Sequence, residues 1–457
     1  MSVHLKRVGA RILAEANDLK RTVPALANEL GLDLDLVTTV VEGRGDVDSA
    51  RKVVDLMVAS YPIRLADLWI EPDDTDEGVR IMRAEESAAT SRVFERKTAK
   101  GTLEPFYEYR DTAMSRLGPF KPEWIAPLRV VENADADNPE VAYNKGHLMH
   151  QTTFFIGDVN FYWKQGDETR CAELSTGDSN YITPFVPHSF TSRDPERPGL
   201  IIAVTYAGPF RGALQDAYRA GTSLSDDWCG DQRDAIDAFG ALMKRHLANE
   251  MMSVAQVATA LREFGIADAR AEAVALGQAL PDAQEVAALM KILSIRQEDL
   301  AVTPIEPGQD VVVRMFDETE ERVWPEGNEV AYRMRPMARS PQQPNLKGFV
   351  MDICKPNDPG PAANLEHMLH EYVYNWSERP VAIYWGDARE SILKPGDSAY
   401  IAPFVKHRFG LCDEGSGRAS IITVRVPGAL TEFALQDFAC FDTRGRDRAQ
   451  GENTQWF

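Results

Sequence analysis

Apolar residues recur at helical spacing along the first forty residues of the chain. The positions are Val8, Ile12, Leu13, Leu19, Leu26, Leu30, Leu34, Val37 and Val41. Thr22 lies between the two groups, and its hydroxyl suits a helix N-cap. The pattern therefore predicts short amino-terminal helices joined by short turns, and a second helical block over about residues 250–302.

A strand-like pattern follows each helical block. Aromatic and β-branched runs at 152–156, 159–163 and 200–206 are separated by Gly, Asp and Pro residues. Such residues favour pleated strands, and the separators favour turns. Many short strands at this spacing indicate a barrel.

The chain contains an internal duplication. The segment 177–190, GDSNYITPFVPHSF, returns at 396–409 as GDSAYIAPFVKHRF, with ten of fourteen positions identical. Smaller pieces return in the same order, including 147–151 at 367–371 and 213–216 at 434–437. Repeats of this kind decide the architecture of a chain before local propensity does.

The predicted fold class is therefore α+β, a tandem repeat of a small helical domain and a β-barrel. We expect helical domains at residues 1–75 and 223–305, and barrels at 76–222 and 306–457. The first barrel is expected to carry the active site.

Composition narrows the range of functions. The chain has 457 residues, with 50 Lys plus Arg against 70 Asp plus Glu, so its net charge is −20. This charge disfavours nucleic acid and anionic membranes as partners. No apolar run approaches the length of about 18 residues that suggests a membrane helix, and the first residues lack a signal-peptide core. The five cysteines are scattered, as is typical of reduced thiols, so we expect a soluble cytoplasmic protein.

A ligand-sensing transcriptional regulator is an alternative, because the short helices are similar to a repressor-type helix-turn-helix. The segment that would read DNA, Gly31–Leu36, contains Asp33 and Asp35. Base readout requires Arg, Lys, Asn or Gln instead. A structural role for the helices is therefore favoured.

Histidines point to a metal site. The chain has eight, and six lie in the repeated motifs: His147, His150, His188, His367, His370 and His407. On a strand, side chains alternate between faces, so His147 and Gln151 are expected to share one face while His150 points to the other. With His188, they would form one face of a metal site. A hydrogen-bonded cluster of core histidines is the alternative.

The second half offers a parallel set. His367, Glu371 and His407 are closer to the two-His, one-carboxylate pattern of non-haem iron oxygenases, and the sequence does not decide whether they bind a metal. Tyr332-Arg333 upstream is interpreted as an echo of Tyr109-Arg110.

The motifs also carry a family resemblance. A His-rich strand, a Trp-bearing strand, a Gly-Asp turn and Pro-x-x-x-His resemble the two metal motifs of the cupin superfamily, so the chain resembles a bicupin. Asn144-Lys-Gly-His147-Leu-Met-His-Gln151, followed by 177–188, resembles the iron site of the family that contains methylphosphonate synthase and 2-hydroxyethylphosphonate dioxygenase.

The resemblance implies particular residue roles. His147, Gln151 and His188 are the implied Fe(II) ligands. The dioxygenase has a glutamate ligand six positions before its second histidine, where this chain has Ile182; the synthase instead uses a glutamine at the position of Gln151. The implied phosphonate contacts are Lys20, Arg96, Tyr109 and Asn144, and Lys20 would come from the same or a neighbouring subunit. A neighbouring origin would favour a homo-oligomer.

The implied reaction cleaves the carbon–carbon bond of 2-hydroxyethylphosphonate with O2, giving methylphosphonate and carbon dioxide, and needs no external reductant. The alternative product pair, from the dioxygenase, is hydroxymethylphosphonate and formate. A zinc or manganese isomerase of the cupin type also stays open, because His and Gln do not fix the identity of the metal.

Overall fold

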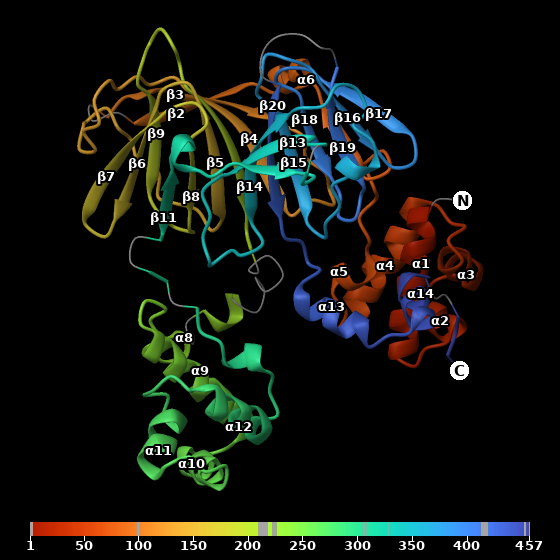
Figure 1. Ribbon diagram of the computed structural model, residues 1–457. Helices are drawn as coiled ribbons and strands as arrows, with labels where there is room; N and C mark the ends of the chain where they lie inside the picture. Colours follow the sequence, from red (N-terminus) through yellow and green to blue (C-terminus); the bar gives the residue numbers. More distant parts are fainter. Residues whose placement is uncertain are drawn as a thin grey trace.

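The computed structural model shows four groups of elements (Figure 1). It describes residues 3–97, 101–208, 218–221, 226–303, 305–306, 309–327, 329–412, 419–451 and 454–456. Two groups are helical and two consist of paired β-sheets, so helices and sheets are segregated as an α+β chain requires. Within the described ranges, no helix combines the length and the hydropathy needed to cross a membrane.

The first helical group has its own apolar core, which includes Val8, Leu26 and Val37. Thr22 caps the second helix as predicted, because its side chain accepts a hydrogen bond from Ala25 N, and the predicted amino-terminal helices are confirmed. The helices are α1 (Val3–Asp18), α2 (Val23–Leu30), α3 (Leu34–Val41), α4 (Val47–Ser60) and α5 (Leu65–Leu68).

The acidic residues of the segment that would read DNA serve the fold. Asp33 is the N-cap of α3, and its carboxylate accepts a hydrogen bond of 2.8 Å from Asp35 N. Asp35 lies in the first turn of the same helix, where negative charge interacts favourably with the helix dipole. Both carboxylates therefore have a structural function.

The second helical group also has its own core, built around Phe239, Leu261 and Leu289. Ser253 begins α10 with a capping box that it forms with Gln256. The group lies below the sheets in Figure 1. Its elements are α8 (Asp226–Cys229), α9 (Ala235–Glu250), α10 (Val254–Glu263), α11 (Asp268–Ala275), α12 (Ala283–Leu293) and η1 (Gln297–Leu300).

A seven-stranded antiparallel sheet, in the order β11-β8-β5-β10-β4-β3-β2, faces a three-stranded sheet, β7-β6-β9. We call these two sheets the amino-terminal sheet pair. Apolar side chains from both sheets, such as Phe155 and Phe161, form the core between them. The strands are β2 (Arg92–Lys97), β3 (Leu103–Asp111), β4 (Phe120–Pro127), β5 (His150–Ile156), β6 (Val159–Gln165), β7 (Glu168–Leu174), β8 (Ser179–Ile182), β9 (His188–Ser192), β10 (Leu200–Tyr206) and β11 (Val311–Arg314).

The second half repeats this arrangement as the carboxy-terminal sheet pair, with the sheet orders β1-β18-β15-β20-β14-β13-β12 and β17-β16-β19. Its core includes Ile383 and Phe409. The strands are β1 (Val79–Met82), β12 (Arg322–Trp324), β13 (Tyr332–Pro336), β14 (Lys347–Ile353), β15 (His370–Asn375), β16 (Val381–Trp385), β17 (Arg389–Leu393), β18 (Ser398–Ile401), β19 (His407–Leu411) and β20 (Ser420–Val426).

The two sheet pairs exchange one strand each. β1 follows the first helical group but pairs with β18 of the carboxy-terminal sheet pair, and β11 follows the second helical group but pairs with β8 of the amino-terminal sheet pair. Sheet membership therefore departs from the expected boundaries at 76 and 306. The local pattern of a strand predicts that it pairs, but not with which edge.

The repeated Gly-Asp pairs hold the exchanged segments in place. Asp178 Oδ1 accepts a hydrogen bond of 2.8 Å from Phe316 N, just after β11. Asp397 Oδ1 likewise accepts one of 2.8 Å from Ala84 N, just after β1. Each turn that the sequence repeats is thus a contact with the other half.

The outer faces of the two seven-stranded sheets pack against each other. One continuous apolar cluster joins residues such as Phe154 and Val204 of the first half with Tyr372 and Val424 of the second. Because side chains alternate along each strand, one face of each sheet serves this interface and the other faces the interior of its own sheet pair. The two interiors are consequently separate.

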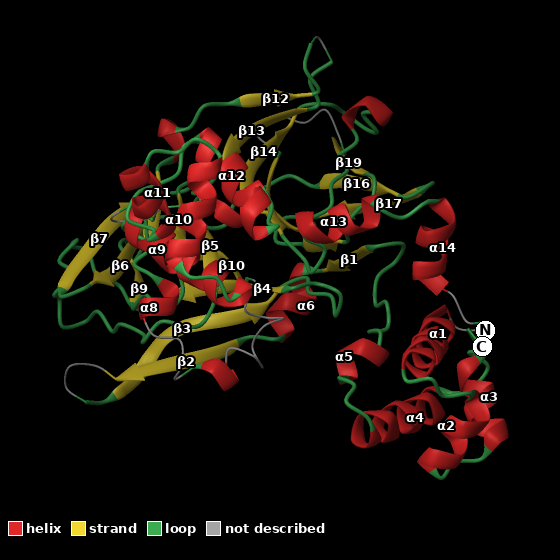
Figure 2. Ribbon diagram, turned by 90° about the horizontal axis from the view of Figure 1, so that it is seen from below, coloured by secondary structure: helices red, strands yellow, loops and turns green. Residues whose placement is uncertain are grey.

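The carboxy terminus returns to the first helical group, where α14 contacts α1 (Figure 2). Asn17 is 1 % exposed; its amide donates to Thr454 O at 3.0 Å and accepts from Trp456 N at 3.2 Å. The remaining helices are α6 (Ala84–Ala89), η2 (Phe316–Glu318), η3 (Pro361–Ala363), α13 (Glu432–Ala439) and α14 (Thr443–Gly451).

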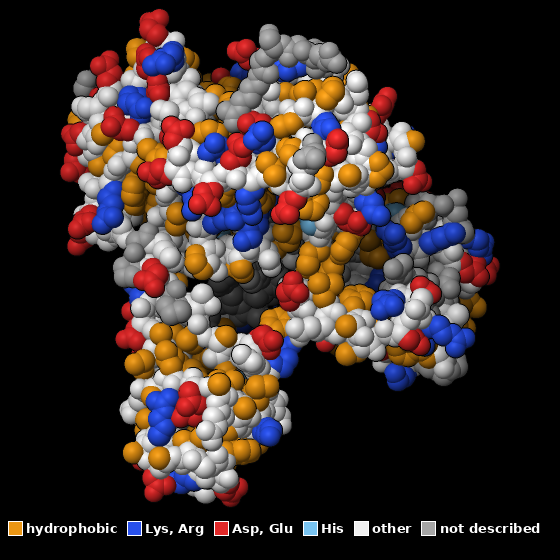
Figure 3. Space-filling model, viewed as in Figure 1, with side chains coloured by type: hydrophobic (Ala, Val, Ile, Leu, Met, Phe, Trp, Pro, Cys, Tyr) orange, Lys and Arg blue, Asp and Glu red, His pale blue; other side chains and the backbone are white. Residues whose placement is uncertain are grey.

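Charge is unevenly distributed on the surface. On the face shown in Figure 3, Lys and Arg side chains gather near the lower ends of β8 and β14, while acidic side chains are scattered over the rest. The acidic excess of the chain is therefore compatible with local binding of an anion.

Candidate metal centre

The three predicted metal ligands come together in the amino-terminal sheet pair. Gln151 is the second residue of β5 and His188 is the first residue of β9. His147 Nε2 lies 3.2 Å from Gln151 Oε1, and the rings of His147 and His188 lie 5.4 Å apart, almost perpendicular. Gln151 and His188 are each 4 % exposed.

His147 does not lie on the strand where we expected it, because β5 begins only at His150. The backbone turns at Gly146, which has a φ of +73° and packs so closely that a Cβ would lie 2.6 Å from Phe185 Cα. Only glycine fits such a position. His147 therefore reaches Gln151 from a turn, and not through strand alternation.

The hydrogen-bond network assigns the tautomers of both imidazoles. His147 Nδ1 lies 3.2 Å from Met149 O, and His188 Nδ1 lies 2.9 Å from Val186 O. A carbonyl oxygen can only accept, so each Nδ1 carries the hydrogen and each Nε2 presents a lone pair. The two Nε2 atoms are thus the atoms of this pair that are available to a metal.

Gln151 presents a third lone pair. Its Nε2 donates to Thr153 Oγ1 at 3.0 Å, which directs Oε1 toward His147. Two acceptors therefore face each other at 3.2 Å with no hydrogen between them. A bound cation resolves this contact, so the residues fit a ferrous ion with two imidazole ligands and one amide ligand.

Asn144 lies beside the cluster. Its Oδ1 accepts from His188 N at 2.8 Å and from Gly146 N at 3.0 Å, which leaves Nδ2 3.0 Å from His188 Nε2. Burial lowers the pKa of His188 to about 4, so its imidazole is neutral at physiological pH. Asn144 therefore holds an N–H donor next to a metal-facing nitrogen.

His150 lies outside the cluster, as the alternation of faces predicts. Its Nδ1 is 2.8 Å from the hydroxyl of Tyr181 and its Nε2 is 3.0 Å from Gln343 Nε2 of the second half. Burial lowers its pKa to about 4. His150 belongs to the interface between the two sheet pairs.

Arg96 is near the cluster. Its guanidinium carbon lies 4.8 Å from the centre of the Tyr107 ring, and it donates hydrogen bonds to Ala142 O and, at 3.5 Å, to Ser189 Oγ. Ser189 follows His188, and the charge of Arg96 adds to the effect of burial in lowering the pKa of that histidine.

Tyr109 is on the same side of the sheet, with its ring 5.7 Å from that of Tyr107. Burial raises the pKa of its hydroxyl, while Arg96 and Arg92 oppose this rise. The hydroxyl stays protonated at physiological pH and can donate a hydrogen bond.

Lys20 is not brought to the cluster within one chain. It follows α1 with a φ of +59°, its Nζ donates to Asn17 O at 3.2 Å, and it lies 5.6 Å from the centre of the Trp456 ring. Figures 1 and 2 both place this helical group beside the carboxy-terminal sheet pair, away from β5 and β9.

The chain is similar to known proteins over almost its whole length. No family model matches the chain. Over 465 residues it is 34 % identical to methylphosphonate synthase of Nitrosopumilus maritimus, an alignment that covers 99 % of this chain and 96 % of that protein. The chain belongs to the methylphosphonate synthase family.

Solved structures support the family assignment. The structure of Streptomyces albus HEPD, with its substrate 2-hydroxyethylphosphonate and Fe(II) bound, matches with a TM-score of 0.87 and 31 % identity over 99 % of both chains. PhpD with cadmium atoms matches with a TM-score of 0.72 and 19 % identity, over 97 % of this chain and 99 % of that one. The latter shows a shared fold alone.

Ile182 occupies the place across from Gln151. It is the direct sheet partner of Gln151 and is fully buried, so an apolar side chain fills the position where the family's dioxygenase is expected to have its carboxylate. On the other side, Gln151 pairs with Thr205. Gln151 thus has uncharged neighbours in both directions.

The carboxy-terminal sheet pair of this family member has a matching cluster. His367 precedes β15 just as His147 precedes β5, and its Nε2 lies 2.8 Å from Glu371 Oε2. His407 Nε2 lies 3.0 Å from the same oxygen. The ligand atoms of these three residues lie within 4.8 Å of one another.

Arg425, which sequence reasoning missed, lies across the sheet from Glu371, with its Nε 3.4 Å from Glu371 Oε1. Burial raises the pKa of Glu371, but the charge of Arg425 opposes this effect, and the pKa lies well below its usual value. The repeat could have revealed this arginine, because residues 200–206 align with residues 420–426, and Arg425 then corresponds to Thr205.

The interpretation of Tyr332 as an echo of Tyr109 is wrong. Phe409 N donates to the hydroxyl of Tyr332 at 2.9 Å, just as Phe190 N donates to that of Tyr107 at 2.8 Å. Tyr332 therefore takes the place of Tyr107, two residues from the expected one. Tyr107 and Tyr109 lie two residues apart on the same face of β3. Sequence similarity alone therefore did not decide which of these two tyrosines corresponds to Tyr332.

Proposed function

We propose that the protein converts 2-hydroxyethylphosphonate and O2 into methylphosphonate, carbon dioxide and water, with a ferrous ion as cofactor. Membership of the methylphosphonate synthase family supports this activity, and the HEPD structure holds the same substrate and Fe(II) on a chain of the same fold. The observation that carries the proposal is the acceptor–acceptor contact of 3.2 Å between His147 and Gln151.

The iron would be held by His147 Nε2, Gln151 Oε1 and His188 Nε2. When bound, it supplies the site at which the substrate chelates and dioxygen is activated. The three protein ligands are neutral, so the charge of the metal is offset mainly by the anionic substrate. Binding of the phosphonate therefore has a direct electrostatic effect on the metal.

The remaining residues bind and orient the substrate. Asn144 presents its amide N–H to the ligand side of His188. Arg96 carries the positive charge that a phosphonate requires, and stacking on Tyr107 fixes its plane. Tyr109 contributes a protonated hydroxyl. Together they hold the reacting carbon in one orientation and limit the access of water.

We place Lys20 in the pocket of a second copy of the chain. Its distance from β5 and β9 within one subunit supports this arrangement (Figure 1). Its stacking on Trp456 holds the ammonium group at the surface of the helical group. The protein is accordingly a homo-oligomer in which each pocket is completed by a neighbour.

The finer architecture that we propose is a bicupin. Each sheet pair is a cupin barrel, and a helical domain precedes each barrel. The chain divides into domains at 1–75, 76–222, 223–305 and 306–457, except that β1 and β11 each lie in the barrel of the other half. The two matching sheet orders and the two independent helical cores support this division. The exchange of β1 and β11 joins the two halves without removing the repeat.

One experiment decides the product. The protein is reconstituted with Fe(II) without oxygen, supplied with 2-hydroxyethylphosphonate and air, and analysed by phosphorus NMR. We expect methylphosphonate, because Ile182 stands where the dioxygenase is expected to have its glutamate, and Gln151, its partner across the sheet, supplies the glutamine of the synthase. The full-length match to HEPD favours a second candidate, the dioxygenase; hydroxymethylphosphonate as the only product would assign that activity.

A further inference from the structure

The cluster in the carboxy-terminal sheet pair has the same lone-pair geometry as the first one. His367 Nδ1 lies 3.0 Å from Leu369 O, and His407 Nδ1 lies 2.9 Å from Val405 O. Each Nδ1 therefore carries the hydrogen, and each Nε2 directs a lone pair toward Glu371. We propose that His367, Glu371 and His407 bind a divalent transition-metal ion, a second one in each chain.

Hydrogen bonding alone does not satisfy this cluster. Both Nε2 atoms approach the same oxygen, Glu371 Oε2, at 2.8 and 3.0 Å. His407 Nε2 is buried and, among the described residues, makes no hydrogen bond despite the short distance. A cation bound by all three residues would bring their ligand atoms this close together, even though the geometry of His407 and Glu371 is not that of a hydrogen bond.

The charge around the ion would match that of the first site. Gln151 pairs across the sheet with Thr205, and both are neutral. Glu371 pairs at the equivalent position with Arg425, and their charges cancel. In both sheet pairs the three ligands, taken together with the residue across the sheet, are therefore net neutral, although one set of ligands contains a carboxylate.

A cavity of about 710 Å³ adjoins this cluster. Arg425 lines the cavity and also reaches Glu371. The lining residues that matter here are Arg322, Met334, Phe349, Asn364 and Arg425. Met334 lies opposite Arg322, as Tyr109 lies opposite Arg92 in the first half. The cavity is thus the counterpart of the proposed substrate pocket.

Positive charge gathers at this cavity. The guanidinium carbons of Arg322, Arg339 and Arg425 lie 5.5, 5.0 and 5.5 Å from the centre of the Phe349 ring. Arg339 Nε and Nη2 are buried and have no hydrogen-bond partner within the described part of the chain. Arg425 is paired with Glu371, so Arg322 and Arg339 carry the positive charge that an anion beside the ring would offset.

Two of the three acidic side chains that line the same cavity, Glu321, Glu326 and Glu366, are ion-paired. Glu321 pairs with Arg333 at 2.7 Å, and Glu366 pairs with Lys406 at 3.8 Å. Arg322 and Arg339 against Glu326 leave a net positive charge here, which suits a small oxyanion of the phosphate or phosphonate class beside the metal.

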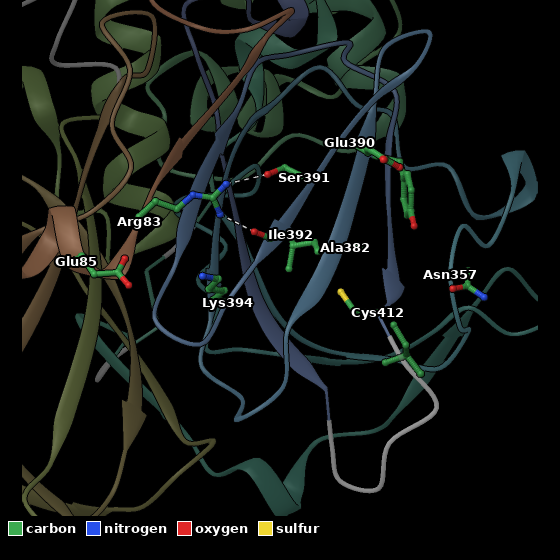
Figure 4. Close-up of a pocket in the computed structure, with 11 residues that line it drawn as sticks. Arg83, Glu85, Asn357, Ala382, Glu390, Ser391, Ile392, Lys394 and Cys412 are labelled. Carbon is green, nitrogen blue, oxygen red and sulfur yellow. Dashed lines mark hydrogen bonds between the residues drawn. The ribbon is translucent and has the colours of Figure 1, made fainter.

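The cavity of about 640 Å³ outside β16 and β17 differs from this site (Figure 4). Its Arg83 donates to Ser391 Oγ at 2.9 Å and pairs with Asp397 at 2.7 Å, so its charge is used by the fold. The second metal and its oxyanion therefore belong to the cavity at Arg425.

Cobalt binding tests the metal site on the full-length protein. Wild type and variants are loaded with Co²⁺ without oxygen, desalted, and measured for bound cobalt and for visible d–d absorption. We expect about two ions per chain in wild type and about one in His147→Ala, which leaves the second cluster intact. Loss of all cobalt from His147→Ala would overturn the proposal.

Matched variants identify the second ligands. His367→Ala preserves the Glu371–Arg425 pair, and we expect it to lose about one ion per chain. His370→Gln, three residues away on β15, contacts Tyr400 at 2.8 Å and should retain both ions. Full cobalt content in His367→Ala would also overturn the proposal. Should His367→Ala fail to fold, the cobalt count of His147→Ala decides alone.

Inorganic phosphate is the probe for the oxyanion. Mn²⁺-loaded His147→Ala should shorten the phosphorus relaxation time of added phosphate, and adding Arg322→Ala should abolish this effect. Adding Arg170→Ala instead, which removes an exposed arginine that is paired with Glu168 in the other half, should leave it unchanged. Equal relaxation with and without Arg322 would overturn the oxyanion assignment. None of these readouts depends on turnover at the first cluster, so failure here is distinguishable from failure of the proposed function.

Discussion

Thr205 lies directly across the sheet from Gln151, in the place that Arg425 takes across from Glu371. A neutral pair in one half thus corresponds to an oppositely charged pair in the other. Each pair keeps the interior of its sheet pair free of uncompensated charge, which is costly in a buried environment. The choice of ligand is therefore coupled to the residue across the sheet.

Replacing Gln151 by Glu breaks this coupling. The new carboxylate would be buried between Ile182 and Thr205 without an arginine across from it. We expect the metal-free Gln151→Glu protein to lose about 1–3 kcal/mol of unfolding free energy, and Mn²⁺ to restore it. Thermal unfolding with and without Mn²⁺ measures the effect.

Glu371→Gln is the matched control, because it leaves Arg425 without its carboxylate and should also destabilise the protein. Mn²⁺ should restore the unfolding free energy of this variant less, because a metal cation cannot replace the carboxylate that Arg425 has lost. Equal stability of metal-free wild type and Gln151→Glu would contradict the argument.

The ligand set of the first cluster predicts a sharp contrast among neighbouring positions. Gln151→Ala and His188→Ala remove metal-binding atoms, and we expect turnover to fall by more than ~100-fold. His150→Ala should keep iron and activity, because His150 contacts Tyr181 and Gln343 at the interface between the sheet pairs. Iron content and phosphorus NMR measure both effects.

His150→Ala should nevertheless cost stability. It leaves the buried hydroxyl of Tyr181 and the partly buried amide of Gln343 without their contacts, and we expect a loss of about 1–3 kcal/mol of unfolding free energy. Loss of iron from His150→Ala equal to that from Gln151→Ala would show that the assignment of faces is wrong.

Much of this arrangement could be predicted from the sequence. The rest could not, and the reasons are physical. Helical spacing and the Thr22 cap predicted the amino-terminal helices, and the repeat predicted two equivalent halves. Alternation along β5 correctly separated His150 from Gln151. His147 reached the same cluster through the turn at Gly146, which no strand pattern describes.

The sequence did not predict which distant segments of the chain contact each other. The repeated Gly-Asp-Ser motif indicated only a turn, yet Ser179 Oγ accepts from Ala338 N and Ser398 Oγ accepts from Ala113 N, both at 2.8 Å. These partners lie more than 150 residues away in each case. A motif conserved between the halves can therefore act between them, and local propensity does not reveal this.

Asn144 is expected to affect substrate binding more than metal binding. Its side chain fixes the backbone at His188 and holds an N–H donor beside the ligand. In Asn144→Ala, KM should rise about 10–100-fold with iron still bound. Steady-state kinetics together with iron analysis test this. A fall in kcat together with loss of iron would mean that Asn144 mainly supports the metal.

The exchanged strands should make the two halves unfold as one unit. Asp178 accepts hydrogen bonds from Ser175 N in its own half and from Phe316 N after β11. Asp178→Ala removes both and should lower the unfolding free energy by about 1–3 kcal/mol. Calorimetry of wild type should show the sheets of both halves melting in one transition. The control Asp194→Ala changes an exposed turn and should have little effect.

Mixing inactive variants tests whether Lys20 serves a neighbouring subunit. Lys20→Ala should be inactive because its pocket lacks the ammonium, and His147→Ala because it lacks an iron ligand. In a mixed dimer, the intact cluster of the Lys20→Ala chain receives Lys20 from the His147→Ala chain, so one of its two pockets is complete. Random exchange in equal amounts should restore about a quarter of wild-type activity if the assembly is a twofold dimer.

Trp456→Ala should weaken the rescue, because the ring lies 5.6 Å from Lys20 Nζ and a cation–π contact is worth about 0.5–2 kcal/mol. Activity that stays absent on mixing, while exchange of subunits is confirmed by native mass spectrometry, would place the function of Lys20 within its own chain.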